Sequence, residues 1–241
     1  MSSYSELKET AWRCNMELPK LGLAVGTFGN ASAVDRERGV MAIKPSGVPY
    51  GELRPEMMVI VGLDAAVADG SLRPSSDTKT HALLYRKFSG IGGIVHTHST
   101  YAVAWAQAGK SVPVLGTTHA DHCAEDIPCT KRMTDAMIRG DYEEETGNLI
   151  VSTFARRSYT DVPMVLVAGH GPFAWGATPG EAVEHSFMLE ELAKIACLTL
   201  QINPDVPRLK RSLIEKHFRR KHGAGSYYGQ SGRRPGKGDG R

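Results

Sequence analysis

Apolar side chains recur three or four positions apart along the first twenty residues, which is the spacing that lines one face of a helix. The residues in this pattern are Tyr4, Leu7, Ala11, Cys14 and Leu18. Pro19 and Gly22 follow, so we expect the helix to end there. Further helices are predicted through Phe88, around 101–108, over 181–200 and over 209–222, the last of them basic.

Short runs of branched aliphatic residues, bounded by Gly and Pro, predict buried strands between these helices. The runs cover residues 40–44, 57–61, 91–98 and 164–168. Residues 112–121 predict a short strand and a loop, and residues 148–154 fit either a strand or the start of a helix. No internal repeat or linker is visible, so we expect one α/β domain over residues 1–230, with a central sheet between helices in three layers.

The composition is that of an ordinary globular protein, since 41% of the 241 residues are hydrophobic and 23% are charged. No apolar run approaches the roughly 20 residues that a membrane-spanning helix needs, and the N-terminus lacks the pattern of an export signal. The four cysteines show neither a Cys-x-x-Cys motif nor the spacing of a disulfide framework. The sequence therefore predicts reduced thiols and a cytoplasmic location.

Positive charge is concentrated at the C-terminal end. Residues 208–241 hold 11 Lys and Arg residues against two acids, whereas the whole chain has a net charge of only +3. Such an end fits a nucleic-acid partner, a phosphate-binding patch or a solvated tail. Residues 231–241 are rich in Gly and almost free of apolar side chains, so they cannot bury enough surface to offset the entropy of ordering. We predict a disordered basic tail there.

Two histidines stand at the end of a predicted strand. His96 and His98 are two positions apart, and alternate residues of a strand share one face, so both imidazoles should point the same way. His170 follows another apolar run, and Asp77 lies in a loop before His96. Each residue has a structural explanation as well, such as a helix N-cap for Asp77. Together, three imidazoles and a carboxylate favour a site for Zn²⁺ or another first-row divalent metal.

Three short loops are rich in small hydrogen-bond donors. Their residues are Gly29 and Asn30, then Lys44, Ser46 and Gly47, and finally Ser75 and Ser76. Backbone N–H groups, hydroxyls, an amide and an ammonium are the groups that bind a phosphate monoester. Each loop alone is a weak signal, because these residue types are common in ordinary turns. No Walker motif and no Gly-x-Gly-x-x-Gly motif is present, so we predict no nucleotide site.

Several residues could carry protons, and their sequence context selects none of them. They are Asp121, Glu143, His217, Tyr227 and Tyr228. Acidic runs such as the one that begins at Glu143 are usually solvated, and tyrosines near a loose tail usually serve packing.

Seven segments and the end of the chain form a recognisable series. They are Thr27-Phe-Gly-Asn-Ala-Ser-Ala-Val-Asp35, Ile43-Lys-Pro-Ser-Gly-Val48, Pro74-Ser-Ser-Asp-Thr-Lys-Thr-His81, Gly93-Ile-Val-His-Thr-His-Ser99, Gly116-Thr-Thr-His-Ala-Asp121, Ile127-Pro-Cys-Thr130, His170-Gly-Pro-Phe-Ala-Trp-Gly176 and His222-Gly-Ala-Gly-Ser-Tyr-Tyr-Gly-Gln230. In this order they closely resemble the class II, metal-dependent sugar-phosphate aldolase/adducin superfamily, and within it the L-ribulose-5-phosphate 4-epimerase branch. The resemblance implies a three-layer α/β/α fold with a central, mostly antiparallel sheet.

The resemblance also implies a role for individual residues. The implied Zn²⁺ ligands are Asp77, His96, His98 and His170. The implied phosphate site consists of Gly29, Asn30, Lys44, Ser46, Gly47, Ser75 and Ser76. The implied acid–base pair is Asp121 and Tyr228, with secondary active-site groups at Thr117, Glu143, His217 and Arg220. Family members form C4 tetramers with active sites at subunit interfaces. We therefore expect a homotetramer with shared sites and a sugar-phosphate substrate, and neither a membrane nor a nucleic acid as partner.

The implied reaction interconverts L-ribulose 5-phosphate and D-xylulose 5-phosphate, as in arabinose catabolism, by breaking and re-forming the C3–C4 bond. Aldolases of the superfamily carry Glu where this chain has Asp77, which favours an epimerase. A class II aldolase for a related sugar phosphate and a non-catalytic adducin-like module are the alternatives. Two features depart from the family pattern: Ala168 replaces a histidine found in many relatives, and residues 121–126 are unusually polar.

Overall fold

A seven-stranded sheet forms the centre of the computed structural model, which describes residues 4–222. The strands are β1 (Asn30–Asp35), β2 (Val40–Ile43), β3 (Val59–Gly62), β4 (Val67–Asp69), β5 (Gly93–His96), β6 (Met164–Leu166) and β7 (Pro172–Gly176). They lie in the order β4-β3-β2-β1-β5-β7-β6, and each neighbouring pair is antiparallel. The central antiparallel sheet expected from the sequence is confirmed.

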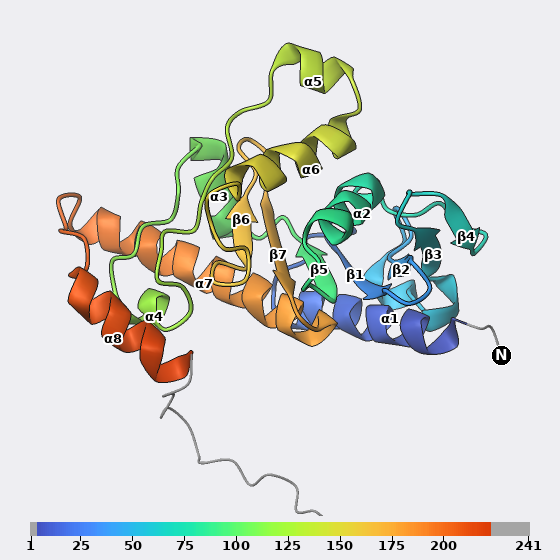
Figure 1. Ribbon diagram of the computed structural model, residues 1–241, viewed down its shortest axis with the longest axis horizontal. Helices are drawn as coiled ribbons and strands as arrows, with labels where there is room; N and C mark the ends of the chain where they lie inside the picture. The colour runs from blue at the N-terminus through green and yellow to red at the C-terminus, as the bar shows by residue number, and fades with distance from the viewer. Residues whose placement is uncertain (1–3, 223–241) are drawn as a thin grey trace, which may run out of the picture.

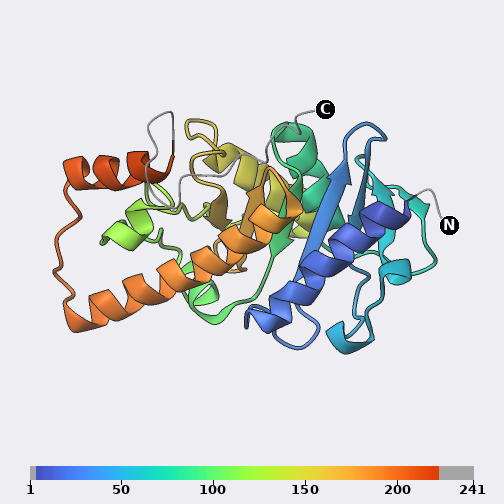
Figure 2. The same ribbon diagram turned by 90° about the horizontal axis from the view of Figure 1, so that it is seen from below.

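Helices cover both faces of this sheet, which gives the expected three layers (Figure 1). The helices are α1 (Ser5–Lys20), α2 (Thr78–Lys87), α3 (Thr100–Ala108), α4 (Thr117–Ala120), α5 (Asp135–Arg139), α6 (Tyr142–Thr153), α7 (Pro179–Ile202) and α8 (Arg211–Lys221), with short 3₁₀ turns η1 (Tyr50–Glu52) and η2 (Pro55–Met57). Figure 2 shows α1 and α7 lying across the same face of the sheet. Helices α2 and α6 cover the opposite face, where Leu84 and Ile150 join the main apolar core.

Strand β1 shows how alternate residues serve the two faces. Ala31 and Ala33 pack in apolar clusters with residues of α1. Asn30 and Ser32 are buried as well, but they are polar and lie on the face that α2 covers. The sheet therefore brings a row of polar side chains to the N-terminal end of α2, and the candidate site is built there.

The structure differs from the sequence-based expectations at a few points. Residues 148–153 form the end of α6, and Phe154 follows as its C-cap; the carboxylate of Asp141 caps the start of this helix by accepting the backbone N–H of Glu144. The expected strand and loop at 112–121 contain helix α4, and Pro19 lies inside the last turn of α1. Strand β5 ends at His96, so His98 lies just beyond the sheet.

Within residues 4–222, no helix is both long enough and apolar enough to cross a bilayer. All four cysteines fall in this described part, and each is a free thiol. Burial raises the pKa of Cys14 to about 11 and that of Cys123 to about 12, so both stay protonated and unreactive near neutral pH. Tyr228 and the predicted basic tail at 231–241 lie outside the described residues.

Candidate metal centre and phosphate pocket

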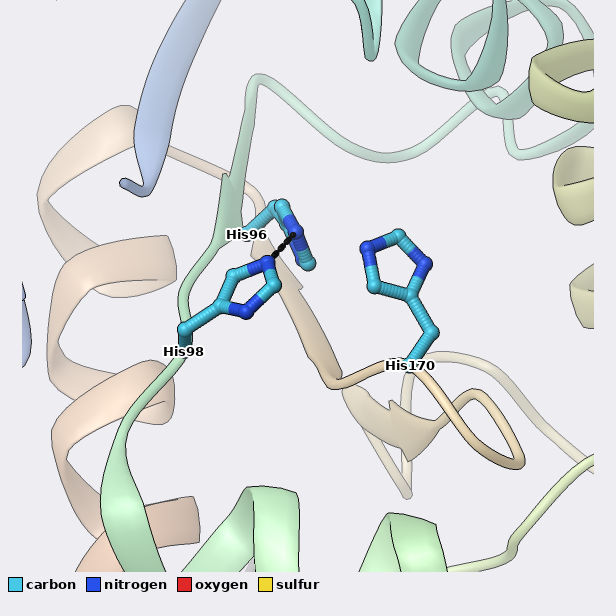
Figure 3. A group of neighbouring side chains, drawn as sticks. All are labelled: His96, His98 and His170. Carbon is cyan, nitrogen blue, oxygen red and sulfur yellow. Dashed lines mark hydrogen bonds between the residues drawn. The ribbon is translucent and has the colours of Figure 1, made fainter. Parts of the chain in front are cut away.

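Three imidazoles converge at the end of β5 (Figure 3). His96 is the last residue of this strand, His98 lies two residues further on, and His170 lies in the turn between β6 and β7. One ligand nitrogen from each histidine lies within 4.8 Å of the other two. The structure thus brings together three histidines from two separate parts of the chain.

His96 is held in one orientation and one tautomer. Its Nδ1 lies 2.9 Å from the carbonyl oxygen of Pro172, and because a carbonyl can only accept, Nδ1 carries the proton. The Nε2 atom therefore presents a lone pair, and it lies 3.1 Å from Nε2 of His98. The His96 ring also stacks on Phe173 with a centroid distance of 4.3 Å. A backbone-anchored N–H with the other nitrogen left open is the usual arrangement of a histidine that binds metal.

The surroundings of the cluster disfavour protonated imidazole. Burial, together with the neighbouring His96, lowers the pKa of His170 to about 4. The same two causes lower the pKa of His98. Neutral imidazoles keep the lone pairs that a cation requires. The donor set therefore fits Zn²⁺ or another first-row divalent metal, with His96, His98 and His170 as the residues that would hold it.

Asp77 lies beside the three histidines without being a member of the group whose ligand atoms are within 4.8 Å of one another. Its carboxylate accepts hydrogen bonds from Asn30 Nδ2 at 2.7 Å and from Ser75 Oγ at 3.4 Å. Burial alone would raise the pKa of Asp77, but the nearby histidines and the Asn30 amide outweigh it, so the net shift is downward. Asp77 is thus an ionised carboxylate, and it makes no side-chain cap for α2.

The histidines open onto a pocket of about 330 Å³. All seven residues of the predicted phosphate site line this pocket, together with Asp77 and Glu143. The predicted metal ligands and the predicted phosphate loops therefore face the same space.

Two of the pocket loops require glycine. Gly29 and Gly47 have φ angles of +91° and +71°, in the left-handed region that side chains disfavour. A Cβ atom at Gly29 would lie 3.2 Å from the carbonyl oxygen of His96 and 3.3 Å from the hydroxyl oxygen of Tyr50. A Cβ atom at Gly47 would meet no described atom within 4 Å. Gly29 therefore serves both the turn and the close approach of the loop to β5.

Lys44 brings a buried positive charge to the pocket. Only 2% of the residue is exposed, and burial lowers the pKa of its ammonium. The Nζ atom lies 4.9 Å from the ring centroid of Tyr50, and its hydrogen bonds to the carbonyl oxygens of Thr27 and Pro45 are long, at 3.5 and 3.4 Å. Weakly compensated charge of this kind gains from binding an anion.

A second group of predicted residues lies apart from this pocket. Asp121 follows α4, and its carboxylate accepts hydrogen bonds from Arg220 at 2.9 and 2.5 Å and from His217 at 3.0 Å, both on α8. Burial raises the pKa of Asp121, but Arg220 and His217 more than offset this effect, so the net shift is downward. Thr117 begins α4, and its backbone carbonyl oxygen accepts a hydrogen bond from the backbone N–H of Asp121. None of these four residues lines the histidine pocket, and Figure 1 places α4 and α8 far from α2.

Two residues that line the pocket, Phe28 and Tyr142, and one that supports a pocket loop, Tyr50, are additions to those singled out from the sequence. The ring of Phe28 stacks on His98 with a centroid distance of 5.3 Å although 59% of the residue is exposed. The hydroxyl of Tyr142 lies 3.4 Å from Nδ1 of His170, and the hydroxyl of Tyr50 donates to the carbonyl oxygen of Gly29 at 2.8 Å. Phe28 belongs to the segment Thr27–Asp35 and Tyr142 adjoins Glu143, so their positions in the sequence could have identified them. No such signal pointed to Tyr50.

Comparisons with known proteins agree with this architecture. An L-fuculose 1-phosphate aldolase is 25% identical, with a TM-score of 0.75 over 91% of this chain and 97% of its own. YgbL from Klebsiella pneumoniae is 22% identical, with a TM-score of 0.69 over 90% of this chain and 99% of its own. An L-fuculose 1-phosphate aldolase from Glaciozyma antarctica PI12, 15% identical with a TM-score of 0.74, covers 93% of this chain and 85% of its own and shares the fold.

The match of the sequence to a protein family is stronger evidence than these structural similarities. The model of the Class II Aldolase and Adducin N-terminal domain matches residues 9–197, which include the whole sheet and every residue of the histidine pocket. The protein belongs to the class II aldolase and adducin N-terminal domain family.

Proposed function

We propose that this protein is a zinc-dependent L-ribulose-5-phosphate 4-epimerase, which interconverts L-ribulose 5-phosphate and D-xylulose 5-phosphate. The observation that carries the proposal is the sharing of one pocket by three imidazoles, a carboxylate and the phosphate loops. The family supports an aldolase- or epimerase-type activity on sugar phosphates, and class II aldolases typically depend on a divalent metal.

The pocket offers groups for both parts of such a substrate. The ammonium of Lys44, the hydroxyls of Ser75 and Ser76 and the backbone around Gly47 offer donors to a phosphate group. The three histidines of the pocket would hold the metal. When bound, a zinc ion supplies Lewis acidity at the carbonyl and hydroxyl oxygens of the substrate.

The chemistry of inversion at C4 explains why the phosphate group must be held. Carbon 4 carries no acidic proton, so simple proton exchange cannot invert it. Removal of the C4 hydroxyl proton with cleavage of the C3–C4 bond gives the enediolate of dihydroxyacetone and glycolaldehyde phosphate. The phosphate loops keep the aldehyde in the pocket while it turns its other face. Re-addition of the enediolate, with return of a proton to the new C4 alkoxide, gives the epimer.

The environment of Asp77 supports an epimerase over an aldolase that uses an acidic residue at this position as a base. Its carboxylate already accepts hydrogen bonds from Asn30 and Ser75, and its pKa is lowered. These hydrogen bonds fix the carboxylate beside the histidines, as a metal ligand requires. We therefore assign Asp77 to the metal and, as the resemblance implies, the proton transfers to Asp121 and Tyr228.

We further propose that the active enzyme is a homotetramer in which a neighbouring subunit supplies Asp121 and Tyr228. The support is that Asp121, with Thr117, His217 and Arg220, forms a cluster outside the histidine pocket of its own chain. Such a cluster could complete the pocket of another copy related by cyclic symmetry. Glu143 needs no neighbour, since it lines the pocket directly.

The second candidate is an aldolase, which the 25% identity to an L-fuculose 1-phosphate aldolase favours. Incubation with ¹³C-labelled L-ribulose 5-phosphate, followed by NMR of the products, separates the two functions. We expect D-xylulose 5-phosphate to accumulate to equilibrium, and a chelator to stop the reaction. Net release of glycolaldehyde phosphate and dihydroxyacetone without xylulose phosphate would show an aldolase instead.

A further inference from the structure

Beneath the histidine pocket, α2 meets β1 through polar side chains. Asp77, His81 and Tyr85 are spaced four residues apart, so they share one stripe along α2. On β1, Asn30 and Ser32 alternate with alanines and face this stripe. The Asn30 amide donates to Asp77 at 2.7 Å, and Ser32 Oγ lies 2.8 Å from His81 Nδ1 and 2.9 Å from the Tyr85 hydroxyl.

His81 is the residue of this stripe whose polar groups are incompletely used. Its exposed fraction is 0%, and its Nε2 has no hydrogen-bond partner among residues 4–222. Buried polar groups in native proteins are nearly always hydrogen-bonded, so this nitrogen calls for an explanation. The ring lies edge-on to Phe173 with a centroid distance of 6.0 Å, and Phe173 in turn stacks on His96. One ring, that of Phe173, therefore connects His81 to His96 of the candidate metal centre.

The neighbours of His81 favour a proton on Nε2. The Tyr85 hydroxyl donates to the carbonyl oxygen of Ser32 at 3.1 Å, so the Ser32 hydroxyl can give its own proton to His81 Nδ1. The ring proton then lies on Nε2. The negative charge of Asp77, one helical turn earlier, acts on the same ring and favours an N–H group on the nitrogen that Ser32 does not use.

We propose that His81 is a positioning residue for Asp77: its Nε2–H donates to the Asp77 carboxylate through one buried water. In this arrangement Asp77 is held from two sides, by Asn30 of β1 and by His81 of its own helix. Burial lowers the pKa of His81 to about 3, so the ring stays neutral and acts as a donor without adding charge. The effect of His81 on metal binding rests on the proposed role of Asp77 as a ligand.

Two substitutions at one position separate the two ring nitrogens. In His81→Gln the amide nitrogen lies where Nε2 was, whereas in His81→Asn it lies where Nδ1 was. Both lose the ring and its packing on Phe173. The measurement is Zn²⁺ affinity of the full-length protein by competition with a chromogenic chelator, with Asp77→Asn as the reference. We expect H81N to weaken Zn²⁺ binding about 10-fold or more and H81Q less than about threefold. Equal losses, or the reverse order, would overturn the proposal.

A spectroscopic test reads the tautomer of His81 in the wild-type protein. Long-range ¹⁵N–¹H correlation spectra of histidine-labelled wild-type protein report the tautomer of each ring, and the signal absent in H81Q belongs to His81. We expect the Nε2–H tautomer, with a resonance that shifts in D77N. The Nδ1–H tautomer would overturn the proposal whatever the protein catalyses. The expected tautomer and ranking in a protein that converts no sugar phosphate would contradict the proposed function and leave this inference intact.

Discussion

The Nε2 atoms of His96 and His98 lie 3.1 Å apart, although only His96 belongs to strand β5. The carbonyl of Pro172 fixes the proton of His96 on Nδ1, so Nε2 of His96 carries an unprotonated lone pair. A hydrogen bond from His98 Nε2 would satisfy this lone pair but would not involve His170. The third imidazole, His170, has its ligand nitrogen within 4.8 Å of both, and a shared cation accounts for all three.

The buried ammonium of Lys44 should contribute to recognition of the phosphate more than to the chemical step. We expect Lys44→Met to raise KM for a sugar phosphate by about 10- to 100-fold, because a charge-assisted hydrogen bond is lost, with a much smaller change in kcat. Lys110→Met, at an exposed lysine outside the pocket, is the matched control. Steady-state kinetics with the phosphorylated substrate gives both constants. An unchanged KM in K44M would exclude Lys44 from the phosphate site.

Gly29 and Gly47 form a matched pair for measuring the close approach of the first loop to β5. Both have positive φ, so Ala at either position should cost about 1–2 kcal/mol in backbone strain. Gly29→Ala also brings Cβ to 3.2 Å from the carbonyl oxygen of His96, whereas Gly47→Ala meets open space. We therefore expect the free energy of unfolding, from urea titration, to fall further in G29A. Equal losses would show that the loop shifts away without cost.

His119 should make the fold sensitive to acid. It is 4% exposed, its Nε2 lies 3.0 Å from the carbonyl oxygen of Glu125, and burial lowers its pKa from 6.5 to about 4. Between these two values the unfolded chain binds the proton that the folded chain refuses, so stability falls as the pH falls through this window. Below the folded pKa the loss is complete, at about 3 kcal/mol.

The matched variant for this prediction is His119→Gln, whose amide can still donate to the Glu125 carbonyl oxygen but does not titrate. We expect the unfolding free energy of wild type to drop relative to that of H119Q between pH 6.5 and pH 4. Chemical denaturation at a series of pH values measures the difference. Parallel curves for the two proteins would refute the assignment of this acid sensitivity to His119.

Shared active sites predict complementation between inactive subunits. Asp121→Asn removes one proposed proton carrier, and His170→Ala removes one proposed metal ligand. If neighbouring subunits complete each site, refolding an equal mixture should restore about a quarter of wild-type activity, since random assembly in a ring pairs the two intact halves at that frequency. Each variant refolded alone is the control. A mixture no more active than its components would place the whole site in one chain.

The sequence predicted the fold well where periodicity was clear. The apolar runs at 40–44, 57–61 and 164–168 became strands, and the helices around the sheet lie close to their expected positions. Local patterns left the choice open where tertiary contacts decide. Residues 148–154 have branched residues that suit a strand, yet the Asp141 cap and packing against α2 make them helical.

The candidate site was predictable in part for a related reason. Histidines at strand ends and Gly-Ser loops can be recognised in the sequence, and the structure gathers them in one pocket. The side chains that hold these residues in place cannot be recognised in this way, because their contacts depend on the register between distant segments. Ser32 meets His81 only because β1 and α2 are packed together, and Tyr50 reaches Gly29 across 21 residues. The sequence also gave no sign that Asp121 would lie outside the pocket.

The central claim is that sugar-phosphate chemistry in this protein depends on a metal held by the three-histidine pocket. The most direct measurement is reconstitution of metal-stripped protein with Zn²⁺, following bound metal and conversion of L-ribulose 5-phosphate together. Activity should rise in proportion to bound zinc and level off at about one ion per chain. His170→Ala should lose both, whereas His185→Ala, at a histidine of α7 outside the pocket whose Nδ1 hydrogen-bonds the Trp175 carbonyl oxygen, should keep zinc. Full activity in the stripped protein, or zinc bound equally well by H170A, would contradict the account.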